Sequence, residues 1–165
     1  MTPINPFAGA FAGIMIFIFA LAAIVTIIVV ISEWILWEKA KQPGWAAIIP
    51  VYATIIRLKV AGKPMTWLIW LMQFYLGYGF YFLFLYTQNP FFALIYFASA
   101  VVRLIFTIMT LNGISKAFGK DEGYTVGLVF LPFIFLPILA FGQATFKGPG
   151  GKPTIDDTTI QPNVY

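Results

Sequence analysis

The sequence predicts an all-α, polytopic membrane protein with four transmembrane helices and an interfacial or re-entrant helix between the first and the second. Two bulk properties indicate this class: only 10% of the 165 residues are charged, against about 25% in soluble domains, and the mean hydropathy is +0.89. The third observation is that long uncharged runs alternate with short loops that carry the Lys and Arg residues. We expect one transmembrane domain, residues 1–146, and a Gly- and Pro-rich tail over residues 147–165.

The first span is expected over residues 8–31. These 24 uncharged residues, at about 1.5 Å each, are long enough for a hydrocarbon core of about 30 Å. Near its start, Gly9 and Gly13 form a GxxxG motif, which permits a close helix–helix contact. Small residues that fall in a membrane helix by chance, packing within the chain and a dimer seam all fit the motif, so Gly9 and Gly13 are helix-packing candidates.

Between the first two spans, residues 38–64 form a hinge that holds half of the Lys and Arg residues. Aromatic and Ile residues recur there at helical spacing and basic residues follow, which predicts an interfacial or re-entrant segment over residues 45–61. A short fifth span is the alternative. A membrane-resting connector and a docking surface both fit the segment, whose candidate contacts to lipid or a partner are Trp45, Tyr52, Arg57 and Lys59.

Three further spans are expected over residues 65–87, 91–111 and 124–143. The turn between the second and third is short, so these two helices should lie antiparallel. Pro132 and Pro137 interrupt the fourth, and each removes a backbone donor and favours a bend.

The distribution of charge predicts the orientation. With four spans, the hinge and the loop after the third span share one side and carry most of the basic residues. The positive-inside rule therefore places residues 38–64 in the cytoplasm and both termini outside the bacterial cytoplasmic (inner) membrane.

Arg103 is the most unusual single residue, because it interrupts the third span and needs a partner or a route to the interface. Counting inward at about 1.5 Å per residue puts Arg103 and Gln73 at matching depths. Glu33, at the end of the first span, comes within reach if the Arg103 side chain extends toward the interface. We expect a structural polar clasp of Arg103, Gln73 and Glu33; a polar transport path and simple snorkelling are the alternatives.

No residue pattern indicates catalysis. The chain has no Cys and no His, which excludes thiol and imidazole chemistry and metal sites built on these residues. Asp121 and Glu122 are adjacent in a polar loop, and Ser115 and Lys116 are neighbours that point about 100° apart on a helix. We expect no enzyme, no metal and no cofactor, with a hydrophobic cofactor among the Phe residues as the alternative.

Two blocks, WEKAKQPGWAAIIPVY (residues 37–52) and FGKDEGYTVGLVFLPFIFLPILAFG (residues 118–142), resemble an uncharacterised family of small bacterial integral membrane proteins. In that family a helix end is followed by Lys-Ala-Gly, Pro-Gly-Trp and Ile-Pro-x-Tyr-Asn, and a later Phe-Gly-Lys precedes a segment with two prolines. Lys41 stands where Gly is usual, and Ala53 where Asn is usual. The resemblance implies a membrane fold without a known activity; some members are labelled signal peptidase I, which these residues do not support.

Taken together, these features predict a non-catalytic accessory or scaffold subunit of a larger bacterial inner-membrane complex. Its partners would be membrane lipids and other integral membrane subunits, because one concentrated basic loop indicates bilayer orientation and no nucleic-acid binding. The alternatives are a small transporter or lipid-handling protein with a polar path near Arg103 and Gln73, and a peptidase-like enzyme.

Overall fold

The computed structural model describes residues 6–153, and the side chains of residues 9–72 and 77–153. All regular elements within these residues are helical, which confirms the predicted all-α class. Three helices are long and apolar enough to cross a membrane: Gly9–Lys39, Met65–Thr87 and Pro90–Ala117. They agree with a membrane protein and match the first three predicted spans.

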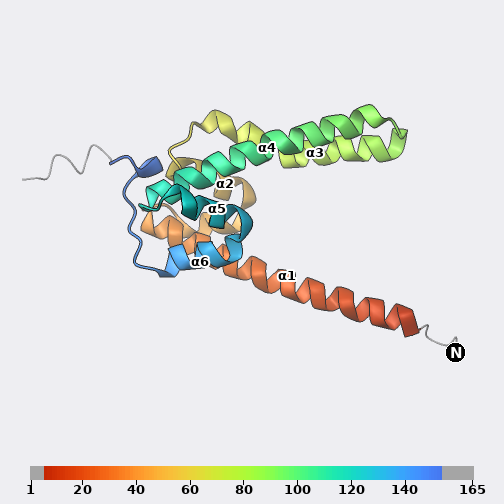
Figure 1. Cartoon of the computed structure of the whole chain (residues 1–165), viewed down its shortest axis with the longest axis horizontal. Helices are drawn as coiled ribbons and strands as arrows, with labels where there is room; N and C mark the ends of the chain where they lie inside the picture. Colours follow the sequence, from red (N-terminus) through yellow and green to blue (C-terminus); the bar gives the residue numbers. More distant parts are fainter. Residues whose placement is uncertain (1–5, 154–165) are drawn as a thin grey trace, which may run out of the picture.

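The six α-helices and three short 3₁₀ helices of the described chain form two long arms and a cluster (Figure 1). In chain order they are α1 (Pro6–Lys39), η1 (Gly44–Ile48), α2 (Pro50–Val60), η2 (Met65–Trp67), α3 (Leu68–Thr87), α4 (Pro90–Ala117), α5 (Glu122–Phe130), α6 (Pro132–Phe141) and η3 (Pro149–Gly151). In Figure 1 the start of α1 and the α3–α4 turn extend in the same direction from the cluster of short helices. The predicted segment over residues 45–61 corresponds to η1 and α2.

Helices α3 and α4 form an antiparallel hairpin, as the short turn predicts. Gln88 ends α3 with a left-handed φ of 53°, and the Asn89 side chain caps α4 by accepting from the N–H of Phe91 at 3.0 Å. Along the pair, the rings of Trp70 and Phe106 stack with centroids 5.5 Å apart. The hairpin is therefore fixed by its turn and by aromatic contacts.

The predicted fourth span is not one helix: α5 and α6 have nine and ten residues and fold back on each other. The chain turns at Leu131, whose φ and ψ of −134° and 57° are not helical, and Pro132 opens α6 at a position where no backbone donor is needed. Tyr124 donates from its hydroxyl to the carbonyl of Phe135 at 2.7 Å, whereas a straight helix would separate these residues by about 16 Å. Pro137 sits inside α6 without ending it.

The packed core lies in the cluster and not between the spans. Its fully buried side chains come from α1, α2 and α4–α6: Leu36, Trp37, Leu58, Ile114, Leu128 and Leu139. By contrast, the most apolar 18-residue stretch of the first candidate span contains no buried residue. In the corresponding stretches of the second and third candidate spans, only 7% and 6% is buried. The buried core therefore lies at one end of the molecule, while its candidate membrane spans are largely exposed.

Candidate functional site

The ends of α1, α2 and α4 carry the same helix cap. At the end of α2 the N–H of Lys63 donates to the carbonyl of Leu58 at 2.9 Å, and Gly62 is left-handed with a φ of 64°. This is a Schellman cap, and α1 and α4 repeat it with Lys41 (φ 55°) and Gly119 (φ 68°) at the left-handed position. Glycine adopts this conformation without steric cost, so Lys41 is the strained member of the three.

Two of these caps are joined by the C-terminal segment, residues 142–153. The N–H of Lys147 donates to the carbonyl of Ala117 at 2.7 Å, at the end of α4. Gly150 lies so close to the end of α2 that a Cβ on Gly62 would come within 3.0 Å of its backbone nitrogen. The segment therefore lies at the same end of the molecule as the hinge, which we call the polar end (residues 32–63 and 112–153). The sequence had predicted the tail to start on the other side.

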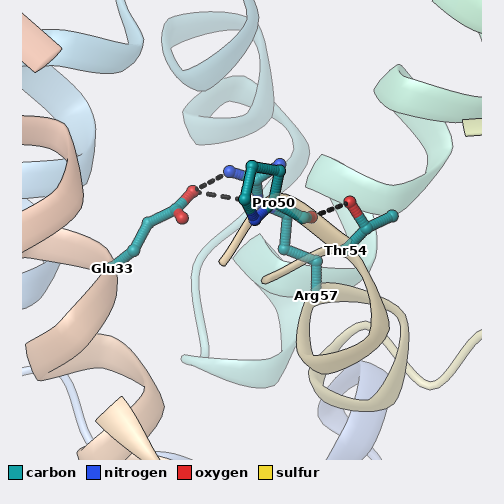
Figure 2. A network of polar contacts seen from close by, with 4 residues as sticks. All are labelled: Glu33, Pro50, Thr54 and Arg57. Carbon is teal, nitrogen blue, oxygen red and sulfur yellow. Dashed lines mark hydrogen bonds and ion pairs between the residues drawn. The ribbon is translucent and has the colours of Figure 1, made fainter. Parts of the chain in front are cut away.

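Glu33 and Arg57 form an ion pair between α1 and α2 (Figure 2). The Arg57 Nε donates to Glu33 Oε1 at 2.9 Å, and Nη2 donates to the same oxygen. The Glu33 side chain is 6% exposed and that of Arg57 38%. Thr54, drawn beside them, bonds to the carbonyl of Pro50 at 2.8 Å within α2. The predicted partner of Glu33 was Arg103; the structure pairs it with Arg57 instead.

Lys39 ties α1 to α6. Its ammonium donates to the carbonyls of Gly142 at 2.7 Å and Leu139 at 3.4 Å, at the C-terminal end of α6. A cation at this position meets unpaired carbonyls and the negative end of the helix dipole. Lys39 thus replaces the missing backbone donors of α6.

The outer face of η1 and α2 is apolar and exposed. Trp45, Ile48 and Tyr52 are 46%, 62% and 47% exposed, and the rings of Trp45 and Tyr52 lie 5.3 Å apart. Lys59 continues this face at its end and is also exposed. Three of the four predicted contact residues, Trp45, Tyr52 and Lys59, therefore share one outward face. The side chain of the fourth, Arg57, points toward Glu33 instead.

Arg103 lies within the α3–α4 hairpin. The Trp70–Phe106 stack and the close approach of Gly77 to Ser99 (3.5 Å from a Cβ built on Gly77) set the register of the two helices. This register places position 73 level with Arg103, but the side chain of Gln73 lies outside the described residues. The predicted Arg103–Gln73 contact stays a prediction.

The acidic pair at the start of α5 has structural contacts. Asp121 caps α5 by accepting from the N–H of Tyr124 at 3.0 Å, and Glu122 pairs with Lys116 at 3.0 Å. The Ser115 hydroxyl donates to the carbonyl of Asp121 at 2.9 Å. Burial raises the pKa of Tyr124, whose hydroxyl is the donor to α6. In the described part of the chain, no group of three or more Asp or Glu residues is placed to hold a metal.

Gly9 and Gly13 lie on the exposed part of α1. A Cβ built on either would meet no described heavy atom within 4 Å. Neither residue packs against another described helix of this chain, which leaves the within-chain interpretation of the GxxxG motif without support.

Sequence reasoning missed the Glu33–Arg57 and Lys39 contacts. A usable signal existed for the first: Glu33 directly follows the uncharged run of the first span, and Arg57 stands in an otherwise apolar helical segment. Opposite charges in such surroundings are expected to pair. The Lys39 contact could not be predicted in the same way, because it depends on the turn between α5 and α6, and a hydropathy pattern does not reveal that turn.

Comparison with protein-family models gives one match, described as "Family of unknown function (DUF5684)", over residues 45–149. This range runs from η1 to the start of η3 and includes the second of the two sequence blocks. No curated protein and no solved structure matches the chain.

Proposed function

The chain belongs to the DUF5684 family of unknown function, and we propose that it is a non-catalytic accessory or scaffold subunit of a larger complex in a bacterial cytoplasmic membrane. The observation that carries this proposal is the location of the core. The cluster at the polar end is packed, while the membrane-level part of α1 buries nothing and the α3–α4 hairpin buries little. Such spans leave intramembrane surface available to other subunits.

The packing between elements supports the same reading. Helix α3 packs along α4, whereas α1 packs on η1 and α6 at the polar end (Figure 1). Transmembrane helices associate through close van der Waals contact, which small residues permit, and Gly9 and Gly13 lie on the exposed part of α1. A partner helix could pack against this face.

We further propose that the polar end faces the cytoplasm and that the C-terminal segment, up to Lys152, lies there too. Of the 10 Lys and Arg residues, all except Arg103 belong to the polar end. None lies before Lys39 or between Lys63 and Arg103, so the start of α1 and the α3–α4 turn carry no basic residue. By the positive-inside rule, this distribution supports the same orientation for all three candidate spans.

The subunit proposal is tested by crosslinking in native membranes. Because the chain has no Cys, single Cys residues can be placed at successive exposed positions of α1, such as Phe17, Ile18 and Phe19, and coupled to a photoreactive maleimide. A partner helix should give adducts of one defined mass at every third or fourth position. Adducts to lipid alone at all positions, or an adduct of twice the chain's own mass, would contradict an accessory role.

A further inference from the structure

The segment formed by η1 and α2 is apolar on its inner and its outer side, whereas a surface helix usually has one apolar and one polar side. Its inner side is packed, with Ala53, Ile56 and Val60 at most 3% exposed. Its outer side presents Ile48, 62% exposed, and Tyr52, 47% exposed. An exposed apolar face on a helix that is already packed on its other side needs a nonaqueous neighbour.

Two contacts fix the level of this face along α1. Gly44 lies against the indole of Trp34, and the Arg57 side chain reaches Glu33. Both ends of the segment between Gly44 and Arg57 therefore lie level with the end of the uncharged run of α1. This level corresponds to the edge of the membrane. The paired rings of Trp45 and Tyr52 suit this level, where aromatic side chains concentrate.

The positive charge at one end of the face indicates which kind of molecule would cover it. Lys59 follows the apolar residues on the same side of α2 and is exposed, and the Arg57 side chain remains 38% exposed beside Glu33. We propose that this outer face binds an anionic phospholipid, with an acyl chain along Ile48 and Tyr52 and the phosphate at Lys59. A zwitterionic lipid would fit the apolar part equally well but would gain less from Lys59.

The test measures lipid binding by the purified, delipidated protein. Native mass spectrometry in mild detergent should show tighter binding of phosphatidylglycerol than of phosphatidylcholine with the same acyl chains. Lys59→Gln should weaken the phosphatidylglycerol affinity about fivefold, the worth of one lysine near an anionic surface. Lys120→Gln, a change of another exposed lysine, in the loop between α4 and α5, is the matched control and should have no such effect.

A second variant separates a lipid from a free phosphate. Ile48→Ser removes apolar contact at an exposed position and should weaken phosphatidylglycerol binding, and soluble glycerol phosphate should not compete. Equal affinity for the two lipids, or equal losses from Lys59→Gln and Lys120→Gln, would overturn the proposal. A polypeptide that crosslinks to Ile48→Cys in native membranes would overturn it as well, because a protein would then cover this face.

Discussion

Glu33 is a carboxylate that lies almost entirely out of contact with water, and Arg57 supplies both hydrogen bonds that its Oε1 receives. Removal of one partner of a fully buried ion pair costs about 3–5 kcal/mol, because the other charge stays buried and unpaired. The exposure of Arg57 reduces this cost, since water can reach the vacated site.

We therefore predict that Arg57→Met lowers the free energy of unfolding by about 1–2 kcal/mol. Thermal unfolding in detergent, followed by Trp fluorescence, measures the change. Lys59→Met, two residues along the same helix, is the control and should be nearly neutral. Adding Glu33→Gln to Arg57→Met should recover part of the loss; a double variant as unstable as the sum of the single changes would show that the two residues do not interact.

Lys41 offers a prediction of opposite sign. Its φ of 55° lies in the left-handed region, which costs a residue with a Cβ about 1–2 kcal/mol, while glycine adopts it freely but loses more entropy on folding. We predict that Lys41→Gly raises the free energy of unfolding by about 0.5–1 kcal/mol. Lys41→Ala removes the same charge and retains the Cβ, so a similar gain from alanine would exclude the backbone explanation.

At the level of elements, the α5–α6 hairpin depends on the absence of a side chain at Gly127. A Cβ at this position would lie 2.5 Å from the ring of Phe135, which packs against Tyr124 with ring centroids 5.2 Å apart. The two helices can therefore approach closely only because residue 127 is glycine.

Gly127→Ala should destabilise the protein by about 1–3 kcal/mol, the usual cost of overpacking a filled interior. Gly123→Ala in the same helix is the matched control, because its Cβ would meet its nearest neighbour, a carboxylate oxygen of Asp121, at an ordinary 3.6 Å. Thermal unfolding of both variants compares them directly. If the two glycines tolerate alanine equally, the hairpin does not have the close packing described above.

The same hairpin marks the limit of sequence-based prediction for this fold. The second predicted span, residues 65–87, coincides with the candidate span Met65–Thr87, because a long uncharged run and a polar turn determine it. Residues 124–143 have similar hydropathy, yet the chain reverses at Leu131. A kinked helix and a hairpin differ there in one residue's φ and ψ, and Pro132 is compatible with both.

For the candidate site, residues within one segment were easier to place than contacts between two segments. Trp45 and Tyr52 belong to the apolar residues that recur at helical spacing, and both lie on the exposed outer side, whereas Ile56 of the same set is buried. Counting depth along the first and third spans offered Arg103 as a partner of Glu33 and did not consider Arg57, which lies in another segment. The structure brings Arg57 of α2 to Glu33, and α2 itself packs on η1 and α4.

At the scale of the whole molecule, the α5–α6 hairpin bears on the proposed topology. With the three candidate spans in place of the predicted four, the chain that follows α4 stays on the side of the polar end. The contact of Lys147 with Ala117 then brings the C-terminal segment to the ends of α1, α2 and α4. The basic residues of this segment, which argued against the predicted orientation, join the others at one end of the protein.

This arrangement predicts the result of a topology experiment. Single Cys residues at Lys41 and Lys152, both exposed at the polar end, should be protected from a membrane-impermeant maleimide in intact cells and should react once the membrane is permeabilised. Gln88→Cys, in the turn at the far end of the α3–α4 hairpin, should react without permeabilisation (Figure 1). About 20 helical residues separate Gln88 from the start of α3, which is sufficient for a hydrocarbon core of about 30 Å. If Lys152→Cys reacts together with Gln88→Cys, residues 124–143 cross the membrane after all, and the contact of the C-terminal segment with α2 and α4 cannot exist in the bilayer.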